Sequence, residues 1–197
     1  MYPAGTMMNV VVTCTPIAPP PNDNPCAAIV LPLNGTACNY VGGDNVAATN
    51  TGAAAPVGIG NVPIPACAGA GYQGADLWYS VVVPPTGLIG IQTTELLCAG
   101  AFELYTTTNC GSGPAFSPLP GSCTTVGQTG PTSVPATVYD ASALVGQTVY
   151  IRYWERNGNE NGSFQICAYA PQPPPNDAPC SAIALPLNTS CVPSPYT

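Results

Sequence analysis

The chain has 197 residues, 46% of them hydrophobic and only 6% charged, with a net charge of −7. It has no histidine for acid–base catalysis, and its two basic residues are too few for the basic patch that binds nucleic acid. No run of residues approaches the roughly 20 consecutive apolar positions of a membrane-spanning helix, and the hydrophobic content is too high for a disordered chain. We therefore expect a folded chain with no enzymatic activity, no nucleic-acid partner and no membrane span.

Short β-strands separated by turn residues are predicted through the middle of the chain, because β-branched and aromatic residues gather there in short runs. Pro84 and Pro85 end the first strand, and the turn that follows favours a hairpin with the second. Asn-Gly pairs between the last two strands favour a closing hairpin. The predicted strands span residues 77–83, 88–94, 102–107, 137–139, 148–154 and 163–169.

The strand pattern predicts an all-β fold, an antiparallel, jelly-roll-like β-sandwich stabilised by disulfides. Prolines and glycines recur too often for long helices. The loops 40–75 and 108–136 are expected to run over the surface, held by disulfides. The expected core consists of Leu77, Tyr79, Val81, Val83, Ile89, Ile91, Phe102, Leu104, Val149, Ile151, Phe164 and Ile166.

A fifteen-residue sequence occurs twice in the chain. Residues 19–33 are PPPNDNPCAAIVLPL and residues 173–187 are PPPNDAPCSAIALPL, identical at twelve of fifteen positions with an offset of 154 residues. Self-similarity at a fixed period indicates a repeat array. We therefore predict the last strand of one module in residues 1–19, a complete sandwich in 20–172 and the start of a following module in 173–197.

The proline-rich sequences are predicted to be the joints of this array. Consecutive prolines favour a stiff, extended polyproline II spacer, and the Asn-Asp that follows favours a turn. The expected partners are therefore neighbouring copies of the same module, arranged head-to-tail.

Ten cysteines are dispersed through the chain, none of them in a CxxC pair. This pattern favours disulfides over a zinc site and indicates an oxidising compartment, so we expect a secreted, extracellular or cell-surface protein. Free buried thiols remain the alternative. Residues 1–20 lack the basic leader of a signal peptide, and we expect the chain to be a segment of a longer or processed protein.

Four segments carry a resemblance to a known family: PPPNDNPCAAIVLPL, GADLWYSVVVPPTG (74–87), FELYTTTNCGS (102–112) and TVYIRYWERNGNENGSFQICAY (148–169). In these segments the chain resembles the repeats of large surface proteins of the Bacteroidota that leave the cell by the type IX secretion system. More loosely, its strand order is similar to that of the bacterial pre-peptidase C-terminal β-sandwich domain. The resemblance implies an adhesion or fibre role without catalysis.

Cys110 and Cys123 lie close in sequence on either side of a loop, and repeats of the similar proteins often carry a disulfide there. We therefore expect a Cys110–Cys123 disulfide. Cys26 is expected to bond either Cys38 or Cys67, and the residues alone leave this choice open.

Two kinds of ligand site are possible from the residue types. Hard oxygen ligands suit calcium, although turn chemistry explains the same residues; they are Asp76, Glu155, Asn157, Asn159 and Glu160. Large aromatic rings on the strands can stack on sugars if they point outward, although packing in the sandwich explains them too; they are Trp78, Trp154 and Tyr153. No other cofactor is expected.

Two functions follow. The first is a structural repeat of an extracellular adhesin or filament that forms a stiff, protease-resistant surface fibre, since the chain combines repetition, stiff joints, disulfides and few charges. The alternative is a carbohydrate-binding appendage of a secreted enzyme. Glu95 and Glu103 resemble a glycosidase carboxylate pair only in residue type, and nothing else in the sequence supports catalysis.

Overall fold

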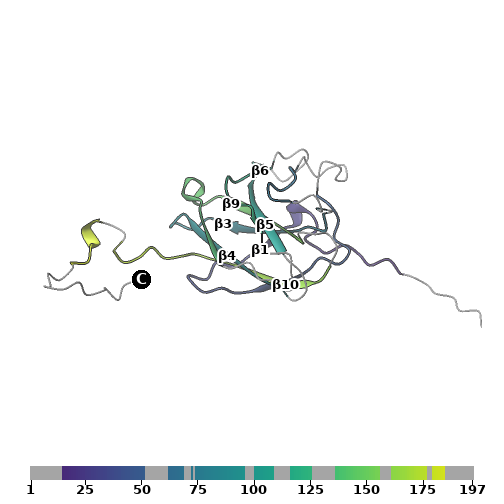
Figure 1. The fold of residues 1–197 in the computed structure, drawn as a ribbon, viewed down its shortest axis with the longest axis horizontal. Coiled ribbons are helices and arrows are strands. Elements are labelled where there is room, and N and C mark those ends of the chain that lie inside the picture. Colours follow the sequence, from purple (N-terminus) through teal and green to yellow (C-terminus); the bar gives the residue numbers. More distant parts are fainter. Residues whose placement is uncertain are drawn as a thin grey trace, which may run out of the picture.

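The computed structural model describes residues 15–51, 62–68, 72, 74–95, 100–108, 116–125, 136–155, 161–176 and 179–184. Within these residues the protein is a β-sandwich of two sheets, with no α-helix and three short 3-10 turns (Figure 1). The predicted all-β sandwich is therefore confirmed. None of the helical turns in the described residues has the length and apolar character needed to cross a membrane.

The larger sheet has six strands, and most of its pairings are antiparallel. β9 (Thr148–Glu155) lies at its centre, between β3 (Leu77–Val82) and β5 (Gly100–Thr106). The short strands at its borders are β1 (Ile29–Val30) on β3, and β6 (Ser117–Pro118) and β7 (Thr124–Thr125) on β5. The β1–β3 pair is parallel, so the antiparallel prediction is wrong at this one described edge, where the long connection between the two strands allows a parallel crossover.

The smaller sheet has four antiparallel strands in the order β2, β10, β4 and β8. Their bounds are Val41–Asp44, Ser163–Tyr169, Leu88–Glu95 and Thr137–Asp140. The three 3-10 turns are η1 (Pro25–Ala27), η2 (Ser142–Leu144) and η3 (Pro179–Ser181).

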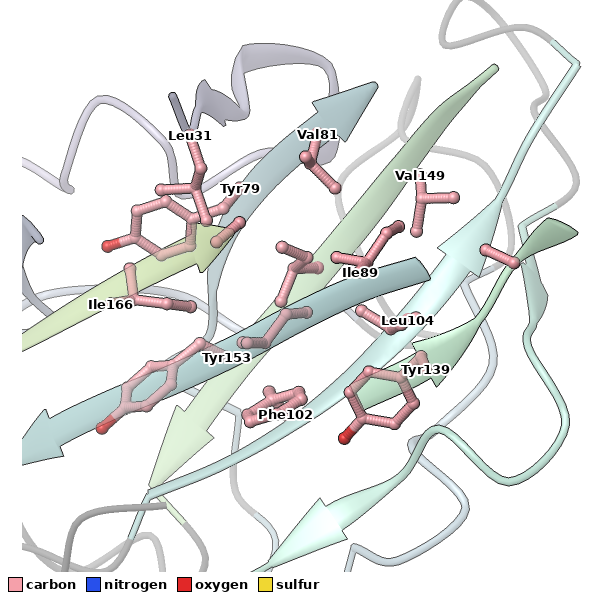
Figure 2. Packing of buried hydrophobic residues seen from close by; sticks show 14 of the residues in the cluster. Leu31, Tyr79, Val81, Ile89, Phe102, Leu104, Tyr139, Val149, Tyr153 and Ile166 are labelled. Carbon is pink, nitrogen blue, oxygen red and sulfur yellow. The ribbon is translucent and has the colours of Figure 1, made fainter. Parts of the chain in front are cut away.

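The predicted core is confirmed, because all twelve expected residues lie in one buried cluster between the sheets. Figure 2 shows side chains from both sheets, such as Leu104 and Ile166, pointing into this shared layer. Leu31 and Tyr139 join the same cluster. Tyr153 also lies there, with its ring stacked on Phe164 at 3.7 Å between ring centroids.

Both predicted hairpins are wrong. β3 and β4 belong to different sheets, and so do β9 and β10, so each connection crosses from one sheet to the other. Pro84 and Pro85 have no backbone N–H with which to continue a ladder beyond β3. The turn closes with the Gly87 N–H donating to the Pro84 carbonyl at 2.9 Å, and Gly87 has φ +71°. The apolar faces of successive strands thus meet across the core instead of side by side.

Candidate functional site

The first proline-rich copy is built into the sandwich at the start of β3. The Asn22 side chain is 3% exposed, and its Nδ2 donates to the Trp78 carbonyl at 3.0 Å. The Trp78 N–H in turn donates to the Asn22 carbonyl at 2.9 Å. One asparagine therefore satisfies both backbone groups of a strand residue, and this attaches the proline-rich segment to the start of β3.

Two further sets of hydrogen bonds extend this attachment. The Asp23 carboxylate accepts from the backbone N–H of Thr49 at 2.5 Å and from its hydroxyl at 2.7 Å. Farther along, Ile29 pairs with Tyr79 in parallel register, and the Leu31 N–H donates to the Ser80 carbonyl at 2.8 Å. Residues 22–31 are therefore a structural part of the sandwich and not a free linker.

The second copy adopts the same local turn, and its described residues, 173–176 and 179–184, are all exposed. η3 occupies the position equivalent to η1, and both turns close with a hydrogen bond of 3.3 Å, Ala28 N–H to Pro25 and Ala182 N–H to Pro179. Cys180 is exposed and is a free thiol, and Ile183 is 37% exposed. Figure 1 shows this yellow turn beyond the sandwich, away from both sheets.

A buried arginine lies on the other face of β9, outside the main core. Arg152 is fully buried, and its Nε donates to the Asp76 carboxylate at 2.8 Å. Its Nη1 donates to the Pro63 carbonyl at 2.9 Å, and its Nη2 to the Thr51 carbonyl at 2.8 Å and to the Tyr72 hydroxyl. Every nitrogen of the guanidinium thus has a partner, and two of the acceptors are loop carbonyls.

The electrostatics of this cluster favour the ionised arginine. Burial is the largest single influence and lowers the pKa of Arg152, but Asp76, Tyr72 and Tyr105 together outweigh it, and the net shift is upward. Burial, together with the negative charge of Asp76, raises the pKa of Tyr72 well above its usual value. Burial and the Glu103 carboxylate do the same to Tyr105. The arginine is therefore a fixed structural charge, and these tyrosines are neutral at ordinary pH.

Aromatic side chains surround the arginine and form a second small core. Trp78, Tyr105, Phe116 and Val62 are buried together on this face, and the guanidinium carbon of Arg152 lies 5.5 Å from the Trp78 ring centroid. Glu103, 2% exposed, accepts from the Tyr105 hydroxyl at 2.5 Å and from the Ala66 N–H at 3.1 Å.

The disulfides correct the predicted pairings. Cys67 bonds Cys123 over a sequence separation of 56 residues, and Cys38 bonds Cys167 over 129 residues. The expected Cys110–Cys123 bond is therefore wrong, because folding brings the loop around residue 67 against the strand next to Cys123. Cys26 is also disulfide-bonded, but with neither Cys38 nor Cys67, so both alternatives for it are wrong. Cys110 itself lies outside the described residues.

The three rings proposed for sugar stacking do not reach the surface. Trp78 and Trp154 are 0% exposed and Tyr153 is 1% exposed. Glycan stacking by these residues is therefore wrong, and their interpretation as packing residues is confirmed. Because side chains alternate along a strand, Trp78 and Trp154 lie on the outer face of the larger sheet, as expected. Loops cover that face, so neither ring is exposed.

Of the five residues predicted to bind calcium, the structure describes only Asp76 and Glu155. Asp76 uses one carboxylate oxygen for Arg152 and the other for the Thr51 N–H at 3.0 Å, so it already has a cationic partner. Glu155 is 2% exposed, while Asn157, Asn159 and Glu160 lie outside the described residues. Among the described residues no group of three acidic or cysteine side chains is arranged to hold a metal.

A shallow groove of about 590 Å³ crosses the outer face of the smaller sheet. Its surface is mostly apolar, and Phe164 and two glycines line it together with two hydrogen-bonded pairs of polar side chains. The Ser163 hydroxyl donates to Asp44 at 3.0 Å, and Thr94 donates to Gln165 at 3.3 Å. Gly42 contributes bare backbone, since a Cβ there would meet no atom within 4 Å. The groove offers hydrogen-bonding groups on a flat sheet surface.

Sequence reasoning missed Arg152, Asn22 and the role of Glu103. One signal was present: Arg152 stands inside a strand in a chain with only two basic residues, and a charge there needs a partner. No protein-family model matches this chain, and no curated protein matches it with significance.

Proposed function

We propose that this chain is a structural repeat of an extracellular adhesin or filament, in which sandwich modules follow one another head-to-tail. The observation that carries the proposal is the second copy of the proline-rich sequence. It lies 154 residues after the first, forms the same turn and stands outside the sandwich. It has the form of the first element of another module.

The disulfides support the predicted module limits. Cys38–Cys167 and Cys67–Cys123 both join residues within 20–172. In the chain-entropy model, closing loops of these lengths stabilises the fold by about 4 to 5 kcal/mol each, an upper figure. Covalent bonds of this kind stabilise a module with few ion pairs in an oxidising, extracellular setting.

The joint supports a stiff fibre. The prolines of residues 19–21 lead directly into Asn22 and Asp23, both of which are hydrogen-bonded to the sandwich. Pro20 and Pro21 lie in a turn that the Asp23 N–H closes on the Pro20 carbonyl at 3.1 Å, so the extended spacer predicted from the prolines is wrong there. A turn restricted by proline rings and anchored at its end still fixes the direction of the chain from one module to the next. Protease resistance is part of the same proposal, because trypsin-type proteases cleave after lysine and arginine. The chain has no lysine and two arginines, of which Arg152 is buried.

Electron microscopy of the native protein tests this proposal. We expect elongated fibres with regularly spaced globular units. Reduction of the disulfides should unfold the globular units while the fibre stays continuous. A population of compact monomers only would contradict the proposal.

The second candidate, a carbohydrate-binding appendage, is favoured by the shallow groove on β2, β10 and β4, because four polar side chains lie beside its apolar surface. A glycan array compares the native chain with Gln165→Ala, which removes an exposed amide from the groove, and with Val138→Ala as the matched surface control. Binding that is lost only with Gln165→Ala supports this candidate, and absence of binding by the native chain rules against it.

A further inference from the structure

We propose that residues 173–184 are a docking element that binds the β3 edge of a second copy of this chain, in the place that residues 19–30 occupy in their own module. The proposal rests on the proposed array, because it names the contact by which one module engages another. It goes further in placing that contact between separate polypeptides.

The first step is that the receptor for this element, the β3 edge, consists largely of backbone groups. Asn22 binds the carbonyl and the N–H of Trp78, and Ile29 and Leu31 follow the backbone of Tyr79 and Ser80. Backbone groups of a strand accept any segment that has the right turn and the right side chains. The β3 edge therefore selects for the Asn-x-x-Pro turn and for the apolar positions after it.

The second step is that the second copy retains the residues that dock. Asn22, Pro25 and Leu31 are the buried residues between positions 22 and 31, and the second copy has Asn, Pro and Leu at the equivalent positions 176, 179 and 185. Its turn is already formed, as η3. The segment is thus prepared for the same receptor.

The third step is that the differences between the copies fall where docking does not need the side chain. The copies differ at positions 24, 27 and 30. Asn24 makes no side-chain cap hydrogen bond, Ala27 is exposed and Val30 is 68% exposed. None of the three substitutions removes a buried contact, so the second copy fits the β3 edge as well as the first.

The fourth step concerns competition. The tethered first copy holds the β3 edge of its own module at high effective concentration, so a segment in trans enters only when the first copy is released or weakened. This is the situation of strand exchange between identical chains. It explains why Cys180 and Ile183 are exposed in the single chain.

Association of the full chain provides the first test. Asn22→Ala weakens the first copy only, and in light scattering we expect this variant of the 197-residue chain to form concentration-dependent oligomers more strongly than the unsubstituted chain does. The matched control is Asn22→Ala with Asn176→Ala, which weakens the second copy equally. One lost hydrogen bond should lower the association constant roughly 5- to 10-fold. Equal association of the two variants, or none by Asn22→Ala, would overturn the proposal.

Covalent capture provides the second test and reports the register. In the docked element Cys180 takes the place of Cys26, which is disulfide-bonded in its own module. Peptide mapping of the unsubstituted chain first identifies the cysteine that is bonded to Cys26. The Cys26→Ser chain is then refolded with reduced and oxidised glutathione, and mapping should find Cys180 of one chain bonded to that cysteine in another. Adding Asn176→Ala should reduce this product several-fold. Cys180 found only as its glutathione adduct, or bonded without preference, would contradict docking in this register.

These outcomes separate the docking from the proposed function. Fibres in the native material without capture of Cys180 leave the array intact and exclude exchange between chains. Capture of Cys180 in a native protein that shows only compact particles supports exchange between chains and excludes the array.

Discussion

The two faces of the larger sheet bury their side chains in opposite ways. On the inner face, aliphatic and aromatic residues meet the second sheet and form one apolar cluster. On the outer face, charged and polar residues lie buried among aromatic rings beneath loops. Ile151 and Arg152 are adjacent on β9 and fully buried, one on each face.

The covering element explains the difference. A sheet satisfies its own backbone hydrogen bonds, so the residues that face it need only fill space. A loop presents backbone groups that must find partners once they are buried. Arg152 binds the carbonyls of Thr51 and Pro63, and Glu103 accepts from Ala66 N–H. Polar side chains under loops therefore hold the loops in place.

The largest expected effect comes from removing the charge on the outer face. Arg152→Met keeps much of the side-chain volume but leaves Asp76 buried without a cationic partner, and we expect a loss of about 3–5 kcal/mol in the free energy of unfolding. Ile151→Val on the inner face should cost about 1 kcal/mol. Chemical denaturation measures both changes.

The double variant Arg152→Met with Asp76→Asn controls for the charge. It should recover part of the loss, because no unpaired carboxylate remains buried. A double variant that is no more stable than Arg152→Met would show that the loop hydrogen bonds, and not the ion pair, account for the effect.

A smaller effect is expected from opening the loop cover itself. Cys67→Ser with Cys123→Ser should lower the free energy of unfolding by about 2–4 kcal/mol. Hydrogen exchange should accelerate first at the outer loops, such as Ala66 and Cys67, while the amides of β10 in the other sheet stay protected. Uniform acceleration in both sheets would mean that the two faces unfold together and that the contrast between them is only one of composition.

The smallest effect at neutral pH is expected at Tyr79 on the inner face. Its hydroxyl is buried and has no hydrogen-bond partner among the described residues, so Tyr79→Phe should change the free energy of unfolding by less than about 0.5 kcal/mol or increase it slightly. Thermal unfolding at pH 7 measures this. A loss above about 1 kcal/mol would show that the hydroxyl has a partner.

The same variant should differ from the native chain at high pH. Burial raises the pKa of Tyr79 to about 12, whereas an exposed tyrosine ionises near 10. Below pH 10 both states are neutral; above it only the unfolded state loses the proton, so stability falls by about 1.4 kcal/mol per pH unit. Tyr79→Phe should reduce the alkaline slope by that amount, while the other buried tyrosines keep the rest. Unfolding curves at pH 9, 10 and 11 give the slope.

Sequence patterns predicted the inner face well because its rule is simple. Alternating apolar residues on short strands identified twelve positions, all of which lie among the seventeen buried residues of the core cluster, since period two assigns each side chain to a face. The same rule placed Trp78 and Trp154 on the opposite face but could not tell that loops would bury them. The period of a strand indicates which face of the sheet a side chain points to, whereas its exposure depends on whether other segments cover that face.

Connections and pairings were predicted poorly because they depend on partners distant in sequence. The turn after Val83 looks the same whether the chain pairs back or crosses to the other sheet, and only the partners of β3 and β4 decide between these. Cys123 has a near neighbour in sequence at Cys110, yet its bond is to Cys67, 56 residues away. Proximity along the chain is a weak guide where loops are long.

The amino-acid sequence alone determined the all-β class, the inner core and the repeated turn, because strand periodicity and the Asn-Asp-x-Pro pattern act through local backbone geometry. Two 3-10 turns 154 residues apart have the same shape in different surroundings. The tertiary structure alone decided which copy is buried, where Arg152 finds its carboxylate and which cysteines bond. Those outcomes require groups that meet only after the two sheets have closed and the loops have covered the outer face.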